Sequence, residues 1–145
     1  MLNTVLFPTD FSEASYKVFS TLEDLQARGI QTVVILHVVD ERSFQAMDHY
    51  AYGRAEEVEK EILDSANDEL EKMAKRLRDQ GFQVIPKLVV GVPVREILKA
   101  EKEDDVSMII IGSHGRSNLE EIFLGSVSEK VVRKARKPVL VVKRS

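Results

Sequence analysis

The sequence of 145 residues contains 21 Lys+Arg and 24 Asp+Glu, a formal net charge of −3, and no cysteine. Its hydrophobic share of 43% is enough for one core and excludes a disordered chain, so we expect one domain over residues 1–145. The lack of cysteine excludes disulfides, cysteine-bound metals and thiol catalysis, and it fits a cytoplasmic protein best. The charge offers no basic surface for nucleic acid, and no apolar run approaches the roughly 20 residues that span a membrane.

Apolar runs without polar alternation predict strands that are buried on both faces, as in a parallel sheet covered by helices. Four such runs are Val5–Phe7, Thr32–Val39, Met108–Ile111 and Val139–Val142. A fifth strand is predicted over Phe82–Val90, which carries Pro86 in its middle.

Helical periodicity separates these strands. A first helix follows Asp10 and is closed by Gly29, and a second runs from Arg54 to Gln80. A third helix follows Pro93, and a fourth ends near Arg136. The segment Asp40–Gly53 is expected to be a loop that packs on the domain, contacts a partner or covers a ligand.

The alternation of strands and helices predicts an α/β, doubly wound, five-stranded parallel sheet with helices on both faces, a Rossmann-like fold. Proline cannot donate to a sheet ladder, so Pro86 favours an edge position for the third strand and the order 3-2-1-4-5. In that order the chain reverses direction between strands one and four, and ligands bind outside the carboxyl ends of the strands at such a point.

The segments Pro8–Asp10 and Gly112–Gly115 follow strands one and four and should face each other there. Asp10 has two interpretations that can coexist. It stands three residues before Glu13, the spacing of a capping box, and it could also accept from a ribose hydroxyl or help to hold a metal-bound phosphate.

The connection from Ser113 to Gly125 is long for an α/β unit. Gly125 would be unfavourable inside a helix, so the fourth helix is expected to start at Ser126, with Ser126 as its N-cap and Glu129 completing a capping box. Glycines that allow close backbone approach, together with a helix N-terminus, suit a polyphosphate. An ordinary glycine-containing loop is the alternative.

Other site patterns are absent or weak. The sequence lacks GxxxxGK[ST], a GxGxxG after strand one and a GxSxG nucleophile elbow. A hydrolytic set of Ser113, His114 and Asp10 has no spacing signal, and the histidines lack metal-ligand spacing. His37 lies in an apolar strand and is interpreted as a buried structural histidine.

The sequence resembles the nucleotide-binding branch of the universal stress protein family over essentially its whole length. The most specific element is the pattern G-x2-G-x9-G-[S/T], met by Gly112, Gly115, Gly125 and Ser126. Supporting elements occur in the order of the family: Pro8–Ser12, His37–Asp40, Gly91–Pro93 and Lys137–Val142.

The resemblance implies an ATP site without catalytic or metal-binding side chains, in which Mg²⁺ or Mn²⁺ is carried by the phosphates. Asp10 would contact the ribose or the metal–phosphate region, and Pro8 and Thr9 would line the crevice. The backbone of Val38 would recognise adenine, and Ile111 would pack near the sugar and base. Backbone groups would hold the phosphates, namely those of Gly112, Gly115, Gly125, Ser126 and Val127.

Family members resemble regulators more than vigorous enzymes, and they form homodimers through the last strand. Val139–Val142 is an apolar strand at an edge of the expected sheet, which is an aggregation liability unless it is paired or covered by the chain's own helices and termini. Three functions remain open: an ATP-binding regulatory homodimer in the stress response, a slow metal-dependent ATPase or nucleotide phosphotransferase, and a protein-interaction module without nucleotide.

Overall fold

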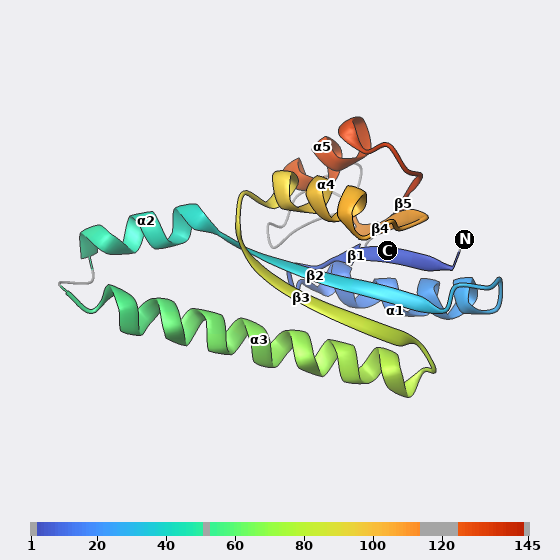
Figure 1. Cartoon of the computed structure of the whole chain (residues 1–145), viewed down its shortest axis with the longest axis horizontal. Coiled ribbons are helices and arrows are strands. Elements are labelled where there is room, and N and C mark those ends of the chain that lie inside the picture. Colours follow the sequence, from blue (N-terminus) through green and yellow to red (C-terminus); the bar gives the residue numbers. More distant parts are fainter. Residues whose placement is uncertain (1–2, 51–52, 114–124, 144–145) are drawn as a thin grey trace.

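The computed structural model describes residues 3–50, 53–113 and 125–143. Five parallel strands form one sheet in the order β3-β2-β1-β4-β5, which confirms the predicted topology. The strands are β1 (Thr4–Pro8), β2 (Thr32–Asp40), β3 (Gln83–Gly91), β4 (Met108–Gly112) and β5 (Val139–Val142). Figure 1 shows the twist of the sheet and the helices that cover it.

Two helices cover each face of the sheet. Side chains of α1 (Glu13–Gln26) and α3 (Ala55–Asp79) share one buried cluster with the strands. Side chains of α4 (Pro93–Glu103) and α5 (Ser126–Lys134) share the other. Strand β1, buried in all but its first residue, contributes Phe7 to the first cluster and Leu6 to the second, as the two-residue period of a strand requires. Both faces are therefore covered, as predicted.

Pro86 lies in β3, which is an edge strand of the described sheet, as predicted. β3 pairs with β2, and Ile35 is the partner of Pro86. The glycine predicted to close the first helix is also confirmed. Gly29 has a φ of 110°, and the N–H of Ile30 donates to the carbonyl of Leu25 across 3.1 Å. This is the bonding of a Schellman C-cap, in which the left-handed residue is usually glycine.

The prediction of a loop over Asp40–Gly53 is wrong, because helix α2 occupies Glu41–Tyr50. The Asp40 carboxylate accepts a hydrogen bond from the N–H of Arg42 at 3.0 Å and so satisfies a donor in the first turn. The helix packs against α3, and Figure 1 shows both helices extending beyond the carboxyl end of the sheet.

Helix α3 is buried most completely along its second half. Leu70, Met73 and Leu77 are fully buried, whereas Val58 and Ile62 are half-buried. The difference follows from the length of α3, whose first turns extend past the sheet (Figure 1). None of the helices in the described part of the chain is long and apolar enough to span a membrane.

Candidate functional site

A cavity of about 300 Å³ opens at the carboxyl ends of β1 and β4, where the strand order reverses. All of the predicted site residues except Gly115 line it: Pro8, Thr9, Asp10, Val38, Ile111, Gly112, Gly125, Ser126 and Val127. Gly115 and His114 lie outside the described residues. The topology thus brings together segments that are about a hundred residues apart in the chain.

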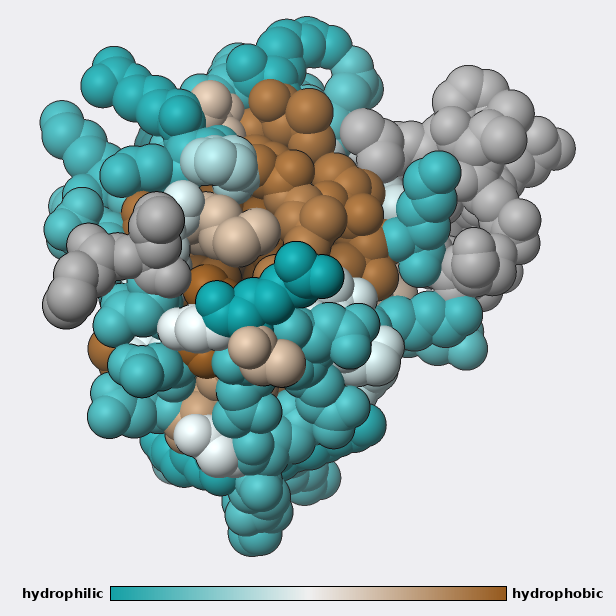
Figure 2. All heavy atoms as spheres, turned by 90° about the vertical axis from the view of Figure 1, so that its right-hand side faces the viewer, coloured by the Kyte–Doolittle hydropathy of each residue, from teal (hydrophilic) through white to brown (hydrophobic). Residues whose placement is uncertain are grey.

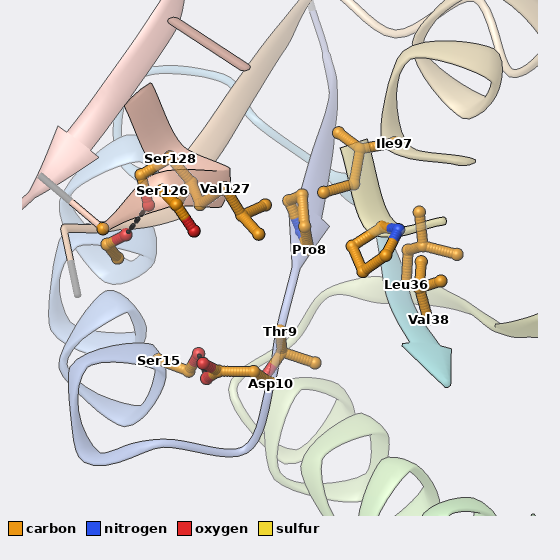
Figure 3. Close-up of a pocket in the computed structure, with 14 residues that line it drawn as sticks. Pro8, Thr9, Asp10, Ser15, Leu36, Val38, Ile97, Ser126, Val127 and Ser128 are labelled. Carbon is orange, nitrogen blue, oxygen red and sulfur yellow. Dashed lines mark hydrogen bonds between the residues drawn. The ribbon is translucent and has the colours of Figure 1, made fainter. Parts of the chain in front are cut away.

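One wall of the cavity is apolar. Figure 3 shows Leu36, Val38 and Ile97 on one side of Pro8, and the first residues of α5 on the other. Pro93 also lines the cavity from the start of α4. Sequence reasoning missed Leu36, Pro93, Ile97, Ser15 and Ser128. The apolar ones carry no polar group that marks a site in the sequence, and only the fold turns them towards the crevice.

The backbone of Val38 faces the crevice. Leu36 directs its carbonyl towards β1, because it accepts a hydrogen bond from the N–H of Thr9 at 2.8 Å. Alternate residues of a strand direct their N–H and C=O groups to the same edge, so Val38 also presents both groups on that side. β1 has ended at Pro8, and these groups therefore lie beside the cavity rather than beside a strand.

Asp10 organises the turn between β1 and α1. Its Oδ1 accepts hydrogen bonds from the N–H of Ser12 at 2.9 Å and from the hydroxyl of Ser15 at 3.1 Å. Its interpretation as the N-cap of this helix is wrong, because Ser12 is the N-cap and accepts from the N–H of Ser15. Asp10 instead shapes the turn before the cap and lines the cavity.

Helix α5 directs its N-terminus towards the same cavity. It begins at Ser126 as predicted, but its N-cap is Gly125, so the assignment of Ser126 as N-cap is wrong by one residue. Gly125 supplies no side-chain acceptor to the first N–H groups of the helix. Its φ of −62° and ψ of 158° are open to any residue, so the backbone conformation does not require glycine here.

Gly112 and the two ends of the connection after β4 have structural roles at this end of the cavity. A Cβ added to Gly112 would lie 3.1 Å from backbone atoms of Ala14, so glycine allows α1 to pack closely on β4. The connection that follows β4 is held at both ends. The N–H of Ser113 donates to the carbonyl of Val142 at 2.9 Å, and the N–H of Gly125 donates to the carbonyl of Ser113 at 2.7 Å.

The charges around the cavity are sparse. Among the described residues, Asp10 is the one charged side chain that lines it. No group of three possible metal ligands of the His, Cys, Asp or Glu type occurs in the described residues. An anion here would be held by backbone donors and the positive end of the helix dipole, and a metal ion would need ligands from a bound phosphate.

A second cavity of about 700 Å³ lies between the end of β2 and helices α2 and α3, and Asp10 and Val38 line both cavities. His37 lines it, as do the carboxylates of Asp40, Glu61 and Glu69. His37 is half-buried rather than buried, and its Nδ1 lies 2.8 Å from the carbonyl oxygen of Thr9.

The fold defines an open, doubly wound α/β protein with a cavity at its switch point, at the carboxyl ends of its strands, where ligands of such proteins bind. Residues 1–143 match the model of the universal stress protein family. The chain belongs to this family.

Individual relatives match over nearly their full lengths. Universal stress protein MJ0577 of Methanocaldococcus jannaschii is 39% identical, over 99% of this chain and 96% of its own. Universal stress protein YxiE of Bacillus subtilis is 32% identical, over 99% of this chain and 100% of its own.

Solved structures of universal stress proteins also superimpose on nearly the whole chain. That of MJ0577 superimposes with a TM-score of 0.88, covering 100% of this chain and 98% of its own at 39% identity. The universal stress protein from Archaeoglobus fulgidus in complex with dAMP superimposes with a TM-score of 0.67 at 22% identity, covering 99% of this chain and 100% of its own. At that identity the second likeness shows the fold alone.

Proposed function

We propose that this universal stress protein binds ATP and acts as a nucleotide-dependent regulatory homodimer in the stress response. The observation that carries the proposal is the make-up of one cavity. An apolar wall and the strand edge at Val38 lie at one side of it, and the uncapped N-terminus of α5 lies at the other. We expect the protein to act in the cytoplasm, the compartment that its cysteine-free sequence favours.

The side of the cavity near β2 suits adenine. The Watson–Crick edge of adenine offers an amino donor beside a ring-nitrogen acceptor, which matches the C=O and N–H of Val38. Guanine offers an acceptor and a donor in the opposite order and would leave these backbone groups mismatched. The side chains of Leu36 and Ile97 supply apolar surface for the base.

The opposite side suits phosphates. The N–H groups of Ser126 and Val127 stand at the start of α5, where the helix dipole favours negative charge. Glycine at 125 keeps the approach to these groups open. Mg²⁺ is commonly bound through one or two carboxylates together with substrate phosphates, and Asp10 is the carboxylate in place for this role. Mn²⁺ accepts the same oxygen ligands.

One relative supports the choice of an adenine nucleotide. The Archaeoglobus fulgidus universal stress protein is described in complex with dAMP. An adenine nucleotide therefore occurs with this fold in another member of the family. For this chain the cavity itself remains the main support.

The homodimer is proposed through β5. All four residues of Val139–Val142 are half-buried, and the strand lies at an edge of the sheet. Figure 2 shows a continuous hydrophobic area on the side of the molecule where β5 ends the sheet. In most proteins an apolar strand at the edge of a sheet is paired with another chain or covered by other residues. A second copy of this chain could do both for β5. Sedimentation at micromolar concentration should give a dimer, and a monomer alone would contradict this proposal.

Nucleotide binding is tested by calorimetry and thermal unfolding with ATP and MgCl2, with GTP as the matched control. We expect ATP to bind, to raise Tm with concentration, and to bind at least about tenfold more tightly than GTP. No heat and no stabilisation with either nucleotide would refute an ATP site. ATP turnover that is lost on replacing Gly115 and Gly125 together would identify a slow ATPase instead of a regulator.

A further inference from the structure

The turn between β1 and α1 holds a residue in an unfavourable backbone conformation. Phe11 has a φ of 64°, in the left-handed region, although it is not glycine. Such a conformation costs on the order of 1 kcal/mol and persists where surrounding contacts impose it. The N–H of Phe11 donates to Oγ1 of Thr9 at 3.0 Å, and its ring stacks on the ring of His37 with centroids 4.1 Å apart and planes 24° apart.

His37 reaches this turn from the far side of the sheet. It lies between Leu36 and Val38, whose side chains line the first cavity, so the two-residue period of β2 directs the His37 side chain to the opposite face. There its Nδ1 lies 2.8 Å from the carbonyl oxygen of Thr9. A carbonyl oxygen accepts only, so Nδ1 carries the hydrogen and His37 is the donor.

The peptide groups of Thr9 are therefore held by β2 on both sides. The N–H of Thr9 donates to the carbonyl of Leu36 at 2.8 Å, and its C=O accepts from His37 at 2.8 Å. The next residue is Asp10, whose carboxylate lines the first cavity. Two fixed hydrogen bonds immediately before Asp10 limit the directions in which this carboxylate can point.

We propose that His37 is a positioning residue of the nucleotide site. It does not line the first cavity, and it acts by fixing the carbonyl of Thr9 so that Thr9 and Asp10 keep their places in the wall. The inference rests on the proposed ATP site for its effect on binding. The effect of His37 on the conformation of the turn can be measured without nucleotide.

Three substitutions separate hydrogen bonding from ring packing. In His37→Asn the side-chain amide can occupy the place of Nδ1 and donate to Thr9, but the ring is lost. In His37→Gln the amide lies one bond further out, near the place of Nε2. In His37→Phe the ring remains and the donor is lost. A role in packing alone would favour Phe over Asn, whereas a positioning role favours Asn over both others.

The experiment measures ATP affinity by calorimetry and amide hydrogen exchange at Phe11 and Ser12 without nucleotide. We expect His37→Asn to stay within about threefold of the original affinity, and His37→Gln and His37→Phe to lose about tenfold, the scale of one hydrogen bond. Exchange at both amides should be faster in the Gln and Phe variants than in the Asn variant. If His37→Phe does not fold, the comparison of Asn with Gln decides.

Equal exchange at Phe11 and Ser12 in the original protein and all variants would overturn the positioning role. So would ATP affinity that follows the ring rather than the donor. If the original protein binds no ATP, the proposed function fails. In that case faster exchange in the Gln and Phe variants would still support His37 as the residue that fixes the turn.

Discussion

The hydroxyl of Ser128 donates a hydrogen bond to the carbonyl of Gly112 across 2.8 Å, and both residues are buried. This bond joins the first turn of α5 to the last residue of β4. It thereby sets the position of the helix N-terminus relative to the end of the strand. The two structural elements that form the proposed phosphate end of the cavity are thus linked directly to each other.

Replacing Ser128 with alanine should therefore destabilise the protein. The substitution leaves a buried carbonyl without this donor, which costs about 1–3 kcal/mol. Urea unfolding measures the change. Ser126→Ala is the matched control on the same helix, because Ser126 is exposed and its loss should stay within about 0.5 kcal/mol. Equal changes in the two variants would show that the bond contributes little.

Replacing Gly125 with valine should weaken ATP binding while leaving the protein folded. Valine can adopt the φ of −62° and ψ of 158° found at this position, but Gly125 is buried, so the larger side chain should cost about 1–3 kcal/mol of stability. Its side chain would stand where phosphates approach α5. We expect a loss of about tenfold or more in affinity, measured by calorimetry.

Ala135→Val is the control for Gly125→Val. Ala135 ends the same helix with a similar conformation, φ −65° and ψ 148°, and it does not line the cavity. ATP affinity should be unchanged in this variant even if packing costs it some stability. A folded Gly125→Val protein that binds ATP normally would contradict the assignment of the phosphate end.

Asparagine at position 10 should separate the two roles of Asp10. The amide oxygen of Asn can accept from the N–H of Ser12 and the hydroxyl of Ser15, as Oδ1 of Asp10 does, so stability should change by less than about 0.5 kcal/mol. The negative charge is lost, and affinity for ATP with Mg²⁺ should fall about tenfold.

Asp10→Ala should lose affinity and, in addition, about 1–2 kcal/mol of stability, because both hydrogen bonds disappear. Calorimetry on Asp10→Asn and Asp10→Ala measures the loss of ATP affinity, and urea unfolding measures the loss of stability. Normal ATP affinity in Asp10→Asn would remove the carboxylate from the site.

The start of α2 should depend on pH through Asp40. Hydrogen bonds from Arg42, chiefly from its guanidinium, lower the pKa of Asp40 below its usual value. A carboxyl with a lowered pKa in the folded protein adds stability above its unfolded pKa and loses that contribution as pH falls through its folded pKa. The difference in unfolding free energy between the original protein and Asp40→Asn should therefore shrink between roughly pH 5 and pH 3.

Urea unfolding at a series of pH values measures this difference. The stability of Arg42→Gln should depend less on pH than that of the original protein, as for Asp40→Asn, because the substitution removes the partner that lowers the pKa of Asp40. A difference that stays constant across the acid range would mean that the pair contributes nothing through its charge.

Much of the fold could be predicted because it depends on local patterns. Unbroken apolar runs marked the strands, and Pro86 alone was enough to place β3 at an edge. The helix over Ala55–Asp79 matched its predicted bounds within one residue at each end. Helix α2 was missed, and its start depends on a hydrogen bond from the N–H of Arg42 to the Asp40 carboxylate, which no apolar pattern marks.

The N-caps show the limit of local patterns most clearly. Asp10 and Ser126 both have the spacing of a capping box, but the caps are Ser12 and Gly125. Which residue caps a helix depends on where the preceding turn directs the chain, and that turn is set by contacts with distant residues. Such contacts leave no fixed spacing in the sequence.

The sequence by itself determined the alternation of strands and helices, the edge position of the third strand and the glycine pattern of the family, since each depends on residue type and short-range spacing. Only the tertiary structure decided that the side chains of Leu36 and Ile97 line the cavity, that Gly112 is needed for packing against Ala14, and that His37 holds the carbonyl of Thr9. The physical reason is that these roles depend on which residues meet in space, and this is decided when the strands pair and the helices pack on the sheet.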